Sequence, residues 1–250
     1  MRFLFCLSAL VFAAVFAPGP AHADAASQRK YDDCMTLARD KPEQGFEQAT
    51  AWRGLGGGDA AEHCAATALV GLGQYAAAAG RLEALAARSK RDPRVKAGLL
   101  AHAAQAWLLD GKSQRAEGVL TAALKLAPDD AALLVDRAEA KAGQKNFAGA
   151  VDDLTEAIRR DGRRPDAFVF RATAYRFLDR LELAQADVAR ALTLEPTHVE
   201  GLLERGILRR LSGDDAGARQ DWLQVLRLAP TSPAADAART NLAAMDVKQK

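Results

Sequence analysis

Alanine recurs in this chain at intervals of 34 residues, a feature that strongly limits the folds open to it. The four alanines are Ala116, Ala150, Ala184 and Ala218. A fixed spacing of this length is typical of stacked structural units, whereas a single globular core needs no such periodicity. We therefore expect an array of short repeated units, and we expect its function to reside on a surface of that array.

Other positions keep the same spacing when windows of 34 residues are taken from residues 97, 131, 165 and 199. Position 8 is always small, as Ala104, Ala138, Ala172 and Gly206. Position 24 is always large and apolar, as Leu120, Leu154, Val188 and Trp222. Two short antiparallel helices approach closely only where small side chains meet, and a bulky residue fills the remaining gap. The pattern therefore predicts an all-α fold built from helix pairs.

These positions resemble the tetratricopeptide repeat, whose 34-residue pattern combines W-x2-L-G-x2-Y, A-x3-F and a late alanine and proline. A helix-stopping residue stands near the end of each window, as Pro128, Gly162, Pro196 and Pro230. The match is degenerate, because position 11 is aromatic as Trp107 and Tyr175 but is Lys141 and Arg209 in the other two windows. The resemblance implies a right-handed superhelix of stacked antiparallel helix pairs, which is a solenoid.

The repeat pattern also defines the expected organisation of the chain. Gly73 and Tyr75 fit an earlier window, so we expect five repeats, at 59–96, 97–130, 131–164, 165–198 and 199–232. A less regular helix pair at 24–58 and a helix with a short tail at 233–250 are expected to cap the two ends. Asp59 and Glu62, three residues apart, predict an acidic capping box at the start of the first repeat.

Residues 1–23 have a different character from the rest of the chain. Arg2 is followed by an apolar run, and the segment ends in Ala21, His22 and Ala23. This order is typical of a cleavable secretory signal. A membrane anchor is the alternative, but an apolar run of about 15 residues is shorter than the roughly 20 that span a bilayer. We expect cleavage after Ala23, a periplasmic or secreted location in a bacterial envelope, and no stable membrane span after cleavage.

Removal of that segment leaves Cys34 and Cys64 as the cysteines of the chain. Two cysteines in an exported protein favour a disulfide, which would join the amino-terminal capping pair to the first repeat. Free thiols and a redox role are alternatives, although no C-x-x-C motif favours the second. A metal site at His63 and Cys64 is disfavoured because neighbouring helix residues point about 100° apart. We therefore expect neither a metal nor another cofactor.

Arginine at position 7 and aspartate at position 23 recur together in three windows. The arginines are Arg137, Arg171 and Arg205, and the aspartates are Asp153, Asp187 and Asp221. Since each window places one of them on each helix, we interpret them as structural ion pairs rather than catalytic acids. No combination of nucleophile, base and orienting group emerges, so we expect no enzyme. A net charge of only +2 also argues against nucleic-acid binding.

The family resemblance supplies a map of the expected binding surface. In tetratricopeptide arrays the first helices line a concave groove, with positions 2, 5, 9, 12 and 13 facing it. The residues expected to bind a partner there are Leu108, Val169, Thr173, Arg176, Phe177, Leu203, Ile207, Arg210 and Leu211. This set is an apolar floor with arginines, which would suit acidic segments. The alternative is that a tightly wound array buries part of this face on its own helices.

The resemblance implies a non-catalytic adaptor or scaffold in the bacterial cell envelope, which binds a peptide or protein segment of another envelope protein. The lysine and asparagine clamp by which some members hold a chaperone's terminal carboxylate is absent, since position 5 is always apolar. An obligate subunit of an envelope assembly remains an alternative. So does a polysaccharide- or cell-wall-associated accessory protein, although the scarcity of exposed aromatic side chains weighs against sugar stacking.

Overall fold

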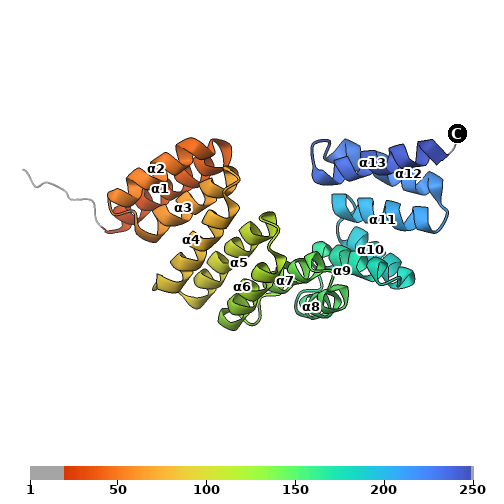
Figure 1. The fold of residues 1–250 in the computed structure, drawn as a ribbon, viewed down its shortest axis with the longest axis horizontal. Coiled ribbons are helices and arrows are strands. Elements are labelled where there is room, and N and C mark those ends of the chain that lie inside the picture. Colours follow the sequence, from red (N-terminus) through yellow and green to blue (C-terminus); the bar gives the residue numbers. More distant parts are fainter. Residues whose placement is uncertain (1–19, 249–250) are drawn as a thin grey trace, which may run out of the picture.

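The computed structural model describes residues 20–248, and within that range it contains thirteen α-helices and no strand (Figure 1). The helices are α1 (Pro20–Asp40), α2 (Pro42–Gly54), α3 (Gly58–Gly71), α4 (Tyr75–Arg88), α5 (Pro93–Leu109), α6 (Ser113–Leu126), α7 (Ala131–Gly143), α8 (Phe147–Arg160), α9 (Pro165–Phe177), α10 (Leu181–Leu194), α11 (Val199–Leu211), α12 (Asp215–Leu228) and α13 (Pro233–Lys248). The expected all-α solenoid is confirmed.

The helices form a curved stack in which each packs against its neighbours in sequence (Figure 1). The first helices of successive units also touch directly, as α5 does α7, α7 does α9 and α9 does α11. The apolar core is accordingly a series of clusters along the array rather than one central mass. Such an array leaves one long face of first helices open to partners.

The pairing of small and large positions has a direct structural cause. A Cβ atom added at Gly206 would lie 2.4 Å from Nε1 of Trp222, which is too close unless the ring or the backbone shifts. Trp222 is buried and its Nε1 donates a hydrogen bond to the carbonyl oxygen of Leu203 at 3.3 Å. Position 8 must therefore be smallest where position 24 is largest.

The three repeated arginine and aspartate pairs form two-pronged ion pairs between the helices of a unit. In the Arg171–Asp187 pair, Nε and Nη2 donate to the two carboxylate oxygens at 2.7 and 2.8 Å. The same arrangement joins Arg137 to Asp153 and Arg205 to Asp221. All three aspartates are buried, so the bridging arginine supplies hydrogen bonds that each carboxylate needs inside the fold.

The cations at position 11 join these ion pairs. Lys141 Nζ lies 2.8 Å from Asp153, and Arg209 Nη1 lies 2.8 Å from Asp221. The sequence shows these residues only as departures from an aromatic position. Their contacts explain the departure, because a second cation at position 11 reaches the same buried carboxylate.

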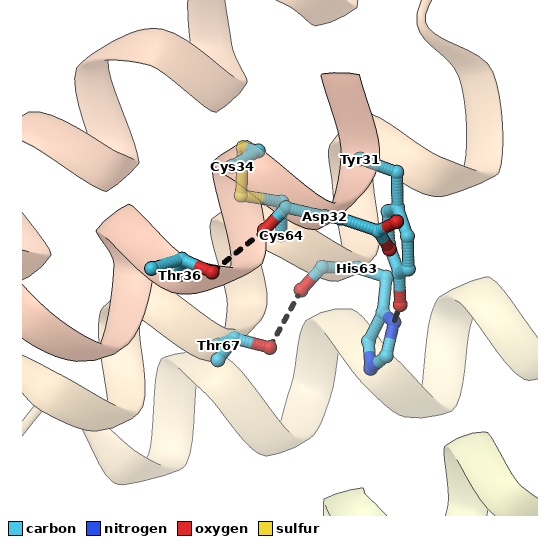
Figure 2. The surroundings of a disulfide bond; sticks show 7 residues. All are labelled: Tyr31, Asp32, Cys34, Thr36, His63, Cys64 and Thr67. Carbon is cyan, nitrogen blue, oxygen red and sulfur yellow. Dashed lines mark hydrogen bonds between the residues drawn. A yellow bond between two sulfur atoms is a disulfide. The ribbon is translucent and has the colours of Figure 1, made fainter. Parts of the chain in front are cut away.

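The amino-terminal units are joined by a disulfide between Cys34 on α1 and Cys64 on α3 (Figure 2). The two Cα atoms are 6.1 Å apart, and both cysteines are buried. On the chain-entropy account, a bridge that closes a loop of 30 residues stabilises the fold by about 3 to 4 kcal/mol. The bridge therefore holds a terminal unit that has a neighbour on only one side.

The predicted capping box at the start of the first repeat is wrong. The helix begins one residue earlier, at Gly58, and no side chain caps it. Glu62 instead turns into the interior, where Arg53 and Arg81 donate to its carboxylate at 3.1 and 3.3 Å. Asp59 accepts a hydrogen bond from the hydroxyl of Ser89 at 2.6 Å. Tertiary partners thus replace the local capping contacts at both acids.

Residues 1–19, which hold most of the expected secretory signal, lie outside the described residues, as do residues 249–250. Because α1 begins at Pro20, the expected cleavage point after Ala23 falls in its first turn. No helix in the described part of the chain combines the length and the apolar character needed to cross a membrane.

Candidate partner-binding groove

A cavity of about 450 Å³ opens where α5 to α9 meet, in the middle of the array. Its walls include three of the expected groove residues, Leu108, Thr173 and Phe177. The lining residues that the sequence analysis did not name include Glu139, Phe147 and Phe170. We call this cavity and its walls the central groove.

The remaining expected residues are divided between the core and the surface. Val169 is only 4% exposed and belongs to the core, so it is not available to a partner. Leu203 and Ile207 are partly buried against the core around Trp222. Leu211 is exposed but does not line the central groove. The array therefore does bury part of this face on its own helices.

Both arginines of the expected set are already paired within the chain. Arg176 donates from Nε and Nη2 to Glu204 at 2.6 and 3.2 Å, and Glu204 is only 4% exposed. Arg210 donates to Asp215 at 2.7 Å. The expectation that these arginines suit an acidic segment therefore loses its basis, since neither guanidinium is left without an acidic partner.

Phe177 is an exposed aromatic side chain held in a fixed position. Its ring stacks on Phe147 with the centroids 4.5 Å apart and the planes 5° from parallel. The guanidinium of Arg176 lies 4.7 Å from the same ring, and its own ion pair with Glu204 fixes it there. Nevertheless 56% of Phe177 is exposed. An exposed, prearranged aromatic ring loses little conformational entropy when a partner covers it.

A carboxylate on α7 gives the wall of the central groove its charge, and a second carboxylate lies close to it on the same helix. Glu139 lines the cavity, and Asp136 lies one turn earlier on the same helix. Burial, together with the nearby Glu139, Asp130 and Asp166, raises the pKa of Asp136 to about 6 against the attraction of Arg164. Desolvation also raises the pKa of Glu139, although the residue as a whole is exposed.

The sequence pattern points to some of these residues but not to others. Glu139 stands at position 9, one of the positions that the resemblance assigns to the groove. Asp136 and Phe170 stand at position 6, which that map omits, and Phe147 is on the second helix of its pair. Their part in the groove follows from the packing of one unit on the next, which no single window contains.

A second cavity, of about 520 Å³, lies in the amino-terminal units and includes Tyr31 and His63 among its walls. The hydroxyl of Tyr31 lies 2.7 Å from Nδ1 of His63, a contact visible in Figure 2. Nε2 of His63 lies 3.0 Å from Nδ1 of His102, so the three side chains link α1, α3 and α5. Burial and the neighbouring His102 lower the pKa of His63 to about 4.

This cluster was not predicted, since its members lie in three different units. The two ring nitrogens of His63 are hydrogen-bonded with Tyr31 and His102, and Cys64 forms the disulfide. Among the described residues, no group of three or more histidine, cysteine, aspartate or glutamate side chains is placed to hold a metal ion.

Comparisons with known proteins place the fold among repeat proteins. A MamA structure from Desulfovibrio magneticus RS-1 is 19% identical, with a TM-score of 0.55, covering 74% of this chain and 97% of that one. Another MamA crystal structure is 15% identical, with a TM-score of 0.54, covering 69% and 92%. The second TPR domain of human RPAP3, solved with an HSP70 peptide, is 29% identical over 47% of this chain and 98% of that one, with a TM-score of 0.45.

A search of curated protein sequences found no match to the chain. The family model described as tetratricopeptide repeat matches residues 65–131, 108–167 and 171–233, which together span most of the helical array. This match agrees with the helix pairs and with the small and large positions found in the structure. The chain belongs to the tetratricopeptide repeat family.

Proposed function

We propose that this protein is a non-catalytic adaptor that binds a segment of another protein in the central groove. The observation that carries the proposal is Phe177, an aromatic side chain that is 56% exposed, prearranged by stacking and placed in the wall of a cavity. Exposed apolar side chains gathered around a hollow are typical of interaction sites. Large aromatic anchors commonly carry much of the binding free energy at such sites.

The neighbouring side chains strengthen this proposal. Phe170, also in the wall, is 39% exposed, and Leu108 adds a partly exposed apolar side chain from α5. Walls from five helices give an occupant apolar contact on several sides. An extended or helical segment could lie along the groove with one large side chain against Phe177.

We further propose that the protein acts in the bacterial cell envelope, with a segment of another envelope protein as its partner. The secretory pattern in residues 1–23 supports export. The Cys34–Cys64 bridge supports it independently, because disulfides persist mainly in oxidising compartments.

Photo-crosslinking in intact cells tests this function. A photoreactive amino acid replaces Phe177 in one variant and Ala148, an exposed residue of α8 outside the cavity, in a control variant. We expect a discrete protein adduct from position 177 and none from position 148. If the exported, folded protein gives no adduct at position 177, or the same adducts from both positions, the central groove is not the binding site. A carbohydrate adduct would instead favour the accessory role at the cell wall.

A further inference from the structure

We propose that the central groove selects segments in which a lysine or arginine lies beside a large apolar side chain. The cation would lie against Asp136 and Glu139, and the apolar side chain would lie against Phe177. This inference rests on the proposed function and names the chemistry of its partner. Such a segment is opposite in charge to the acidic segment that Arg176 and Arg210 suggest at the level of the sequence.

The first support is that the groove carboxylates lack partners of their own. Asp136 and Glu139 are three residues apart on α7, so their side chains emerge on the same face of the helix. Across the described residues, neither carboxylate takes part in a hydrogen bond or an ion pair of its side chain. By contrast, Asp153, Asp187 and Asp221 each have a bridging arginine.

The cations near these carboxylates are already bound elsewhere in the chain. Arg164 attracts Asp136, but its Nη2 donates to Asp166 at 2.6 Å. On α7 itself, Lys141 is paired with Asp153. On α9, Arg176 is paired with Glu204. The lysines and arginines of α7 and α9 are therefore all paired with other acids, and Arg164, whose buried Nε has no hydrogen-bond partner, forms no ion pair with Asp136 among the described residues.

The repeat register explains why Asp136 is left unpaired. Arg176 and Glu204 show that position 12 of one unit meets position 6 of the next. Two units earlier, at the junction of the repeats 97–130 and 131–164, the same two positions hold Leu108 and Asp136, so an apolar residue stands where a cation would complete the pair. At this junction the chain therefore supplies the acidic member of an ion pair but not the cationic member.

A cation from the partner would stabilise the ionised forms of Asp136 and Glu139. Two desolvated carboxylates close together are unfavourable, and an incoming lysine or arginine replaces lost hydration with a charged contact. A segment with acidic side chains would instead add like charge to the same place and be rejected. Because Glu139 and Phe177 line one cavity, the charged and apolar contacts can come from neighbouring residues of a single segment.

A phage-displayed library of short random peptides, panned on the purified full-length protein at neutral pH, tests this inference. We expect enriched peptides to carry lysine or arginine beside leucine, phenylalanine or another large apolar residue. In fluorescence polarisation, the double variant Asp136→Asn and Glu139→Gln should bind an enriched peptide at least about tenfold more weakly, as expected for loss of charged contacts in a groove. The matched control is Asp152→Asn, an exposed acid of α8 outside the cavity.

The outcomes separate this inference from the proposed function. Enriched peptides that are acidic or uncharged, with binding lost in Phe177→Ser, would overturn the charge preference and leave the adaptor function standing. Absence of any enrichment by the folded protein would overturn both. A dimer of the protein alone that Phe177→Ser dissociates would name a second copy as the occupant and overturn the inference. Glu139→Lys, a charge reversal at an exposed tip, should abolish binding even if the double variant fails to fold.

Discussion

At the scale of single residues, the chain uses its charges in two ways. Asp153, Asp187 and Asp221 are buried with dedicated arginines, so they hold helix to helix. Asp136 is partly buried and Glu139 is exposed, and neither has such a partner among the described residues. Proteins commonly keep unfavourable groups where function needs them, at a cost in stability. The contrast between the two groups of acids is therefore the best residue-scale marker of the site.

The first prediction concerns the stability cost of Asp136. Its folded pKa of about 6 lies above the ordinary value of 3.8 for an aspartate, so its contribution to stability is fully present below 3.8 and lost as pH rises through about 6. Asp136→Asn removes the ionised form, and at neutral pH it should raise the free energy of unfolding by about 1 to 2 kcal/mol, after a discount for partial exposure. Urea unfolding at a series of pH values measures this gain.

The gain from Asp136→Asn should fade as pH falls toward 4, where the wild-type carboxyl is protonated. His63 titrates over the same range with the opposite sign, because its lowered pKa makes stability fall on acidification. That effect cancels when the variant and the wild type are compared at each pH. A loss of stability in Asp136→Asn at neutral pH would show that the carboxylate has a structural partner after all.

At the scale of helices and repeats, the frame of small and large residues predicts most of the fold. Ala116, Ala150, Ala184 and Ala218 are all buried at helix contacts, as the spacing indicates. The Arg–Asp pairs were also foreseen, since both members lie in one window. The partners of Glu62 were not foreseen, because Arg53 lies in the preceding unit and the pairing with Arg81 in its own unit does not recur in other windows. Contacts that recur at the same positions of several windows are visible in sequence, and contacts between units largely are not.

The second prediction tests that frame at Gly206. Alanine in a helix interior is favoured over glycine by about 1 kcal/mol, but a methyl group here meets the Trp222 ring, and such overpacking costs about 1 to 3 kcal/mol. Gly206→Ala should therefore lower the free energy of unfolding by up to about 2 kcal/mol. Gly118→Ala is the matched control, since nothing lies within 4 Å of its added Cβ, and it should raise stability instead.

Chemical unfolding of the two glycine variants decides between packing and intrinsic helix preference. If both substitutions stabilise the protein, the close approach of Gly206 to Trp222 does not hold in solution. The cost of Gly206→Ala should also shrink in a Trp222→Leu background, because the two residues are in contact.

At the scale of the whole molecule, two of the hollows along the described part of the solenoid differ in character. The amino-terminal one lies beside the disulfide and the linked Tyr31, His63 and His102, whose mutual contacts leave their polar groups largely satisfied. The central groove instead gathers exposed aromatic rings and the unpaired carboxylate of Glu139, with Asp136 one turn away on α7. Unsatisfied groups favour the central groove as the place where a partner binds. The sequence indicated which face of the array is expected to meet a partner. It did not indicate that the unpaired groups lie at the central groove rather than at the amino-terminal hollow, because that depends on how successive units are stacked.

Amide hydrogen exchange of the full-length protein, with and without an enriched peptide, tests most directly which surface binds. The account predicts slower exchange in α7 and α9, whose side chains would be covered and whose local opening would be suppressed. It predicts no change in α1 and α3, which are already held by the disulfide at the far end of the array (Figure 1). Slower exchange confined to α1 and α3, with α7 and α9 unaffected, would place the partner in the other hollow and contradict the account.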